Sequence, residues 1–156
     1  MKEHQYSILV EWTGNNGKGT SHYKQYSRDH VISATGKQAP IMGASDPLFL
    51  GDPTRYNPEE LLVSSLSACH MLWYLHLCTT HKVIVTAYVD SAVGVMQETA
   101  DGSGKFKEVT LYPCVTVESG GMIEKAKKLH HDANKMCFIA NSCNFKIRHE
   151  PKIVVK

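Results

Sequence analysis

The residues of this chain best suited to chemistry are five cysteines, Cys69, Cys78, Cys114, Cys137 and Cys143. No two of them form a CxxC pair, so their spacing does not indicate a zinc ribbon or a thioredoxin motif. The N-terminal segment does not resemble a signal peptide, and we expect a cytoplasmic protein whose thiols stay mostly reduced. An odd number of thiols in that setting indicates packing, catalysis or redox sensing rather than a disulfide scaffold.

Two of these thiols, Cys69 and Cys137, are expected to face a shared interior. Cys69 lies in the middle of a predicted helix over residues 58–80, and Cys137 ends the apolar stripe of a second predicted helix. If both helices pack on the same sheet, both thiols point inward. A buried cysteine usually acts as a small hydrophobic residue, and spacing alone does not separate that role from thiol chemistry.

The long helix that carries Cys69 has a clear start signal. Asn57 suits the N-cap, Pro58 the first helical position, and Glu59 and Glu60 the first turn. Residues 61–80 contain no Asp, Glu, Lys or Arg, which makes the segment nearly apolar enough to span a bilayer. The serines and histidines of this segment favour instead a helix that is buried on nearly all of its sides in the protein core. We therefore expect no membrane span.

The remaining pattern predicts strands around two helices. Alternation and turn signals predict strands over residues 6–12, 20–34, 83–98, 106–118 and 147–155, with a long loop over residues 35–56. The second helix has an apolar stripe of Met122, Ala126, Leu129, Ala133 and Cys137. This order predicts a single α+β domain over residues 1–156 with mostly antiparallel sheets.

The charge balance narrows the class of partner. Seventeen Lys and Arg residues against fifteen Asp and Glu residues leave a formal net charge of +2. So small a charge gives no electrostatic case for nucleic acid or an anionic membrane as the main partner.

Two segments together resemble the OsmC/Ohr family of osmotically induced and organic hydroperoxide resistance proteins. The first runs from Asn57 to Leu72 and includes Ser67-Ala68-Cys69-His70, and the second is Ala133 to Ser142 around Cys137. The resemblance covers nearly the whole chain. It implies an OsmC-like fold with a long buried central helix, in an intertwined homodimer whose active sites lie at the subunit interface.

The chemistry that this resemblance implies is a cysteine-based peroxidase, a peroxiredoxin-like antioxidant activity of the stress response. Cys69 would be the peroxidatic cysteine, which becomes a sulfenic acid, and Cys137 the resolving cysteine, which condenses with it to a disulfide. An external dithiol would then reduce that disulfide. No metal, flavin or haem is implied, because the redox equivalents pass through sulfur.

The resemblance also implies an Arg that stabilises the thiolate and a Glu that orients the Arg. The Glu matches Glu59, which lies about 15 Å along the helix from Cys69 and could serve only a partner subunit's Cys69. Arg55 is the expected Arg, and Lys18 in the first hairpin is the alternative. An ammonium is less suited than a guanidinium to bind a carboxylate and a thiolate at the same time. By itself, Glu59 could simply favour the helix dipole.

Several features leave the function open. Phe138 follows Cys137 where the family often has Pro, and Cys143 is an extra thiol that we expect outside the helix. Apolar walls formed by Leu66, Leu72, Trp73, Met136 and Phe138 would favour organic hydroperoxides. The alternative is a non-enzymatic OsmC-like module that binds an apolar small molecule and keeps its cysteines buried.

The histidines allow one further alternative. A Cys/His metal site could be drawn from Cys69, His76, Cys137 and His130. The separation of about 10 Å between Cys69 and His76 along one helix argues against it. We expect His130 and His131 to mark the edge of a solvated helix face.

Overall fold

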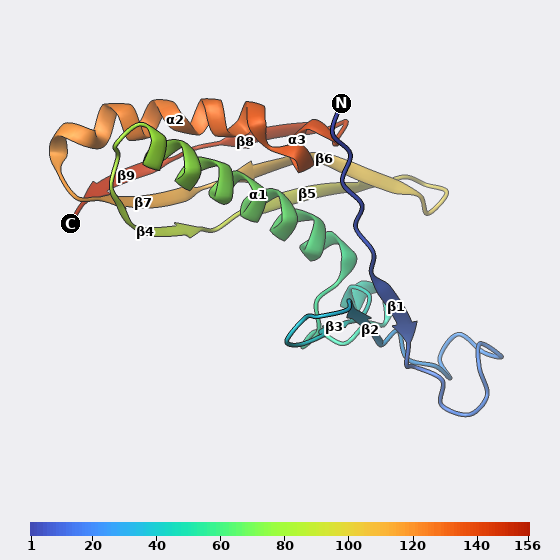
Figure 1. The fold of residues 1–156 in the computed structure, drawn as a ribbon. Coiled ribbons are helices and arrows are strands. Elements are labelled where there is room, and N and C mark those ends of the chain that lie inside the picture. The colour runs from blue at the N-terminus through green and yellow to red at the C-terminus, as the bar shows by residue number, and fades with distance from the viewer. The chain divides into compact units, whose positions relative to one another are not determined.

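A computed structural model describes all of residues 1–156, and the chain is α+β, as predicted. It divides into two compact units, Met1–Leu61 and Leu62–Lys156 (Figure 1). The elements are β1 (Leu9–Trp12), β2 (His30–Ser33), β3 (Ile41–Gly43), η1 (Pro47–Phe49), α1 (Pro58–Thr80), β4 (Val85–Asp90), β5 (Val93–Glu98), β6 (Gly104–Leu111), β7 (Pro113–Val117), η2 (Gly120–Met122), α2 (Ile123–Met136), α3 (Phe138–Asn141), β8 (Lys146–His149) and β9 (Lys152–Val155). The single domain expected over residues 1–156 stays a prediction.

The N-terminal unit contains an antiparallel sheet in the order β1-β2-β3. The strand predicted over residues 20–34 is wrong in extent, because only His30–Ser33 is a strand. Arg28 explains part of the difference. Its guanidinium donates to the carbonyl oxygens of Tyr26 and Tyr23 at 2.7 and 2.8 Å and lies 4.3 Å from the centre of each ring. These local bonds to the backbone compete with strand pairing.

The loop predicted over residues 35–56 also contains more structure than expected. Residues Ile41–Gly43 pair with β2, and Pro47–Phe49 form a 3₁₀ turn. The Asp46 carboxylate accepts a hydrogen bond from the Leu48 backbone amide at 2.8 Å, which caps that turn. This short strand and turn lead the chain to the start of α1.

Helix α1 begins at the predicted residue because its first turn is capped reciprocally. The Asn57 side chain accepts from the Glu60 amide at 2.8 Å, and the Glu60 carboxylate accepts from the Asn57 amide at 3.0 Å. Such a capping box satisfies two backbone donors that the first turn of a helix leaves free. The predicted bounds of the helix, residues 58–80, are confirmed.

The burial of α1 differs from the prediction. Only Leu66, His70, Tyr74 and Cys78, spaced four residues apart, are fully buried within the chain, so the expectation of burial on nearly all sides is wrong for one chain. A single stripe is covered because α2 and the strands of the second unit reach only one side of the helix. By length and composition alone, α1 could also cross a membrane, a test that core helices of water-soluble proteins pass as well.

The C-terminal unit is built on three long strands, each interrupted once. The two sheets have the strand orders β4-β7-β9 and β5-β6-β8. Each long strand therefore contributes one piece to each sheet, and the consecutive pieces are β4 and β5, β6 and β7, and β8 and β9. The β4–β7 and β5–β6 pairs are antiparallel, whereas β6–β8 and β7–β9 are parallel. Figure 1 shows α2 and the C-terminal part of α1 on the same face of these strands.

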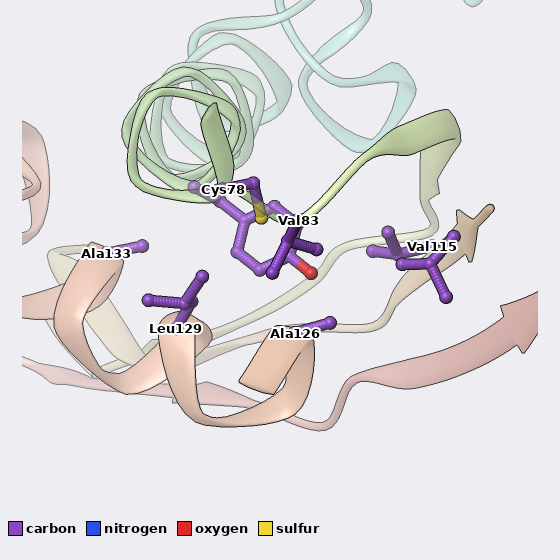
Figure 2. Close-up of a cluster of buried hydrophobic side chains, with 8 residues drawn as sticks. Cys78, Val83, Val115, Ala126, Leu129 and Ala133 are labelled. Atoms are coloured by element: carbon purple, nitrogen blue, oxygen red, sulfur yellow. The ribbon is translucent and has the colours of Figure 1, made fainter. Parts of the chain in front are cut away.

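The core of the C-terminal unit lies between these helices and the strands. The alternation predicted for residues 106–118 is confirmed, because Val109, Leu111, Pro113, Val115 and Val117 are all buried. Figure 2 shows Cys78 of α1 pointing toward Ala126, Leu129 and Ala133 of α2. The apolar stripe of the second helix therefore packs against α1, as its spacing indicated.

Candidate active site

The structure brings the thiols of Cys69 and Cys137 together. Cys69 is half-buried on α1 and Cys137 is buried at the end of α2, and both are free thiols. The two side chains lie within hydrogen-bonding reach of one another. Two neighbouring thiols can form a disulfide when their Cα atoms lie within about 7 Å of one another.

Cys137 lies at a junction rather than inside a helix. Helix α2 ends at Met136, and Cys137 is the N-cap of the four-residue α3. Its sulfur accepts a hydrogen bond from the Ala140 backbone amide at 3.4 Å. Burial and, to a smaller extent, the adjacent Cys69 raise the pKa of the Cys137 thiol to about 11. Cys137 is therefore protonated at neutral pH and can donate to the Cys69 sulfur.

An apolar hollow lies on α1, the helix that carries Cys69. It has a volume of about 270 Å³ and is lined by Leu72, Trp73 and His76, which follow Cys69 by three, four and seven residues. The Phe138 ring lies 5.6 Å from that of Trp73 and is nearly perpendicular to it. This spacing places the hollow on the Cys69 side of α1.

Not every expected wall residue belongs to this hollow. Met136 and Phe138 are exposed, as a wall requires, but Leu66 is 1% exposed and packs with Val109 and Leu111 in the core. Leu66 as a wall of the site is therefore wrong. Leu66 precedes Cys69 by three residues and lies on the side of α1 that faces the sheet.

A buried histidine pair lies next to the thiols, and the sequence analysis missed it. His70 Nε2 and His130 Nδ1 are 3.0 Å apart, and each residue is 1% exposed. The expectation that His130 marks a solvated face is wrong, because His70 and Tyr74 cover it. The Tyr74 ring stacks on His130 with centroids 3.8 Å apart. The position of His130 next to Leu129, four residues after Ala126 and three before Ala133 of the apolar stripe, was the only available signal.

Burial also keeps this pair neutral. It lowers the pKa of His70 to about 4, with a smaller effect from His149. It lowers the pKa of His130 to about 3, with smaller effects from His70 and His149. Neutral imidazoles can share a single hydrogen bond between the two helices, which links α1 to α2 just beyond Cys69.

A second polar contact fixes the turn of α1 that carries Cys69. The Ser67 hydroxyl donates to Asp90 Oδ2 at 2.5 Å, and Asp90 Oδ1 accepts from the Tyr112 amide at 2.7 Å. These bonds connect the helix to the strand breaks after β4 and β6. The sequence offered no signal for them because the three residues are far apart in the chain.

The metal alternative finds no support in the geometry. No group of three or more histidine, cysteine or carboxylate side chains converges on a point that could hold an ion. His76 is exposed on α1, whereas His130 is buried against His70. The four residues considered for a metal therefore do not form one ligand set.

The other thiols occupy three different environments. Cys78 is buried in the core, where desolvation raises its pKa, and Cys114 is exposed on β7. Cys143 is half-buried and lies beyond α3, as predicted, with its thiol donating to the Ile139 carbonyl at 3.2 Å. Burial also raises the pKa of the Cys143 thiol.

Arg55 and Glu59 both lie in the N-terminal unit. The Arg55 guanidinium faces two carboxylates, with Nη2 3.6 Å from Asp29 Oδ2 and Nε 3.7 Å from Asp52 Oδ2. No ion pair joins Arg55 to Glu59 within this unit. Lys18, the alternative cation, lies exposed in the segment between β1 and β2.

Comparison with known proteins gives the family. A profile of the OsmC-like proteins matches residues 51–152. The chain belongs to the OsmC-like family. An OsmC-like protein of unknown function from Vibrio cholerae O1 biovar eltor is 31% identical with a TM-score of 0.82, and the match covers 97% of this chain and 99% of that one.

More distant structures show the same OsmC-like fold. An organic hydroperoxide resistance protein from Elizabethkingia anophelis is 17% identical with a TM-score of 0.67, covering 99% of this chain and 100% of that one. An organic hydroperoxide resistance protein from Legionella pneumophila is 14% identical with a TM-score of 0.64, covering 97% and 99%. No curated protein matches the chain.

Proposed function

We propose that this protein is a thiol-dependent hydroperoxide reductase of the cytoplasm that uses Cys69 and Cys137. The observation that carries the proposal is the proximity of the half-buried Cys69 thiol to the buried, protonated Cys137 thiol, with an apolar hollow along the Cys69 face of α1. Structural cysteines need neither a second thiol in contact nor an open hollow beside them. The family membership supports the same chemistry, since several structural relatives are organic hydroperoxide resistance proteins.

The reaction proceeds through sulfur in three balanced steps. The Cys69 thiolate attacks the terminal oxygen of a hydroperoxide, the O–O bond breaks, and the alkoxide leaves as an alcohol after taking a proton. The resulting Cys69 sulfenic acid and the Cys137 thiol then form a disulfide and release water. A dithiol restores both thiols by exchange and becomes a disulfide itself.

The substrate is an organic hydroperoxide rather than hydrogen peroxide. The hollow on the Cys69 face of α1 exposes mostly apolar surface, from Leu72 and the Trp73 ring, and the Phe138 ring packs against Trp73. Such a surface stabilises an alkyl or aryl group by removing it from water, whereas hydrogen peroxide has nothing to bury.

The site is completed by a second copy of the chain. In this proposal, Arg55 stabilises the Cys69 thiolate and Glu59 supports Arg55 across the interface of a homodimer. A cation is needed because an ordinary thiol, with a pKa near about 8.5, is only a few per cent ionised at neutral pH.

Consumption of cumene hydroperoxide with dithiothreitol tests the proposal. We expect turnover by the wild type, none by Cys69→Ser, and turnover close to wild type by Cys114→Ser, the matched control for an exposed thiol. A wild type that consumes no hydroperoxide, or a Cys69→Ser variant as active as the wild type, would contradict the reductase.

Peptide mapping identifies the resolving thiol. Stoichiometric hydroperoxide should produce a Cys69–Cys137 disulfide, because these thiols are already neighbours. Cys137→Ser should accumulate a Cys69 sulfenic acid that dimedone traps, while Cys143→Ser should turn over nearly normally. A Cys69–Cys143 disulfide in the wild type would show that the resolving residue is wrongly assigned.

The apolar hollow also favours a second function, binding of an apolar small molecule without catalysis. Trp73 fluorescence would respond to such a ligand, with Trp12→Phe removing the other tryptophan signal. Saturable binding of an aromatic probe by a wild type without peroxidase activity would favour this alternative.

A further inference from the structure

The buried histidine pair, His70 and His130, joins the same two helices as the thiols, and the proposed reaction does not use it. His70 Nε2 and His130 Nδ1 are 3.0 Å apart, and the two rings lie within 8° of parallel. His70 immediately follows Cys69 on α1, and His130 precedes Cys137 by seven residues, about two turns of α2. The histidine pair therefore connects the turn that carries one thiol to the helix that leads to the other.

Stability alone does not account for the histidine pair. His70 Nδ1 and His130 Nε2, the two outer nitrogens, are buried and make no hydrogen bond. Each neutral ring carries one N–H, so whichever ring donates within the pair, one outer nitrogen keeps a hydrogen without an acceptor. A buried polar group without a partner costs about 1–3 kcal/mol. Two apolar rings of the same shape would fill this space without that cost.

The other contacts between the two helices do not fix an orientation. They are apolar, and on α2 they come from Ala126, Leu129 and Ala133, which face Cys78 of α1 (Figure 2). Apolar burial stabilises in proportion to its area and has no preferred direction, whereas a hydrogen bond weakens steeply when its distance or angle changes. Apart from the thiols themselves, the histidine pair makes the only side-chain hydrogen bond between α1 and α2.

The turn that carries Cys69 is already held to the strands on its other side. The Ser67 hydroxyl donates to Asp90 Oδ2, and Asp90 Oδ1 accepts from the Tyr112 amide. These bonds fix the turn of α1 relative to the strand breaks, so the placement of Cys137 depends on how α2 is held against that turn. The hydrogen bond of His130 to His70 is the directed contact that holds it.

We propose that the His70–His130 hydrogen bond positions Cys137 against Cys69 and thereby favours the disulfide between them. This inference rests on the proposed function. The bond acts on the resolving step, in which the Cys137 sulfur attacks the Cys69 sulfenic acid, the S–S bond forms, and the hydroxyl leaves as water with the Cys137 proton. His70 and His130 are positioning residues, because neither is proposed to touch the reacting atoms.

The test is the equilibrium of the thiols with glutathione, which needs no hydroperoxide. Cys69 and Cys137 together reduce one glutathione disulfide to two glutathione thiols and form their own disulfide. The equilibrium constant is therefore an effective concentration of one protein thiol at the other. Alkylation of the free thiols, digestion and mass spectrometry measure the fraction of linked Cys69–Cys137 peptide.

The decisive variant is His70→Phe/His130→Phe, which removes both polar partners and keeps two rings. Its free energy of unfolding in urea should equal or exceed that of the wild type, because no buried group is left unpaired. Its effective concentration should fall about tenfold, or about 30 mV in reduction potential. His70→Gln, whose amide can still bond to His130 Nδ1, should keep most of the wild-type value.

The matched control is His149→Phe. The His149 ring lies edge-on to His70 with centroids 5.6 Å apart, and it makes no hydrogen bond to either member of the pair. This variant removes a neighbouring histidine without touching the bond, so its effective concentration should equal that of the wild type. If His70→Phe/His130→Phe does not fold, His70→Leu/His130→Leu replaces it with the same expectation.

Dimedone trapping separates the two halves of the reaction. In the double variant, hydroperoxide should oxidise Cys69 at the wild-type rate, because the histidine pair does not act on the first step. The sulfenic acid should then resolve about tenfold more slowly, so dimedone captures more of it. A slower first step with an unchanged second step would contradict the positioning role.

The outcomes separate this inference from the reductase itself. An unchanged effective concentration in a folded double variant, an equal loss in His149→Phe, or a wild type that forms no Cys69–Cys137 disulfide in glutathione would overturn the positioning role. Failure of both double variants to fold would also overturn it, because the pair would then hold the fold itself. A wild type that forms the disulfide in glutathione but consumes no hydroperoxide would overturn only the reductase.

Discussion

At the residue scale, the five thiols differ in what surrounds their sulfur atoms. Burial raises the pKa of Cys78, Cys137 and Cys143, so these thiols are poor nucleophiles at neutral pH. Cys114 is exposed without any partner in the structure. Cys69 alone combines partial exposure with a protonated thiol donor beside it.

This difference predicts that Cys69 reacts first with an alkylating agent. At about pH 6 an ordinary thiol is almost wholly protonated, so a short exposure to iodoacetamide followed by mass spectrometry should label Cys69 ahead of Cys114. Cys114 serves as the internal control for exposure. Faster labelling of Cys114 or Cys78 would contradict the assignment of Cys69.

At the scale of elements, α1 depends on its first turn and on its contact with α2. The Asn57–Glu60 capping box fixes where the helix starts. Further along the helix, the His70–His130 hydrogen bond and the Cys69–Cys137 contact join α1 to α2. The geometry of the thiols therefore follows from how these two helices pack.

Loss of the cap should destabilise the fold. Asn57→Ala removes an N-cap side chain and is expected to lower the free energy of unfolding by about 0.5–2 kcal/mol. Urea denaturation measures the change. Asn144→Ala, at an exposed asparagine without a side-chain hydrogen bond, is the control and should stay within about 0.5 kcal/mol of the wild type.

The histidine pair should make the folded state sensitive to acid. The pKa of each histidine is lower in the folded than in the unfolded chain, so the unfolded chain binds more protons below about pH 6.5. The free energy of unfolding is therefore highest above that pH. It falls toward pH 4 by at most about 1.4 kcal/mol per pH unit for each histidine.

Urea denaturation between pH 7.5 and about 5 measures this slope, above the range in which most carboxylates titrate. His130→Gln keeps a partner for His70 but removes one titrating group, and should roughly halve the contribution of the pair. A free energy of unfolding that does not change between these pH values would contradict the account of the pair.

At the scale of the whole molecule, α1 and α3 have more apolar surface than one chain covers. Leu72 is 63% exposed and Phe138 is 65% exposed, although both are large apolar residues beside the thiols. Exposed apolar surface of this kind marks interaction sites. In our proposal a second copy of the chain covers most of it.

We therefore predict a homodimer at micromolar concentration, with a total interface above about 2,000 Å². Sedimentation equilibrium measures the mass. Leu72→Glu should weaken association, because it would bury an unpaired charge, while Lys127→Glu on the exposed side of α2 should not. A wild type that sediments as a folded monomer would contradict the dimer.

The sequence by itself determined the features that depend on neighbouring residues. The start of α1 follows from Asn57, Pro58 and Glu60, because capping acts within one turn. The inward face of residues 106–118 follows from their alternation, because side chains of a strand point to opposite faces. The α+β class and the two cysteine-bearing elements follow in the same way.

Only the tertiary structure decided the features that depend on distant partners. The parallel pairing of β8 with β6 and of β9 with β7, the break of each long strand and the short β2 could not be predicted, because strand pairing joins residues far apart in the chain. The contact of Cys69 with Cys137, the burial of His130 under His70 and the carboxylates around Arg55 are decided in the same way. Each depends on where two elements meet in space, which no local pattern of residues encodes.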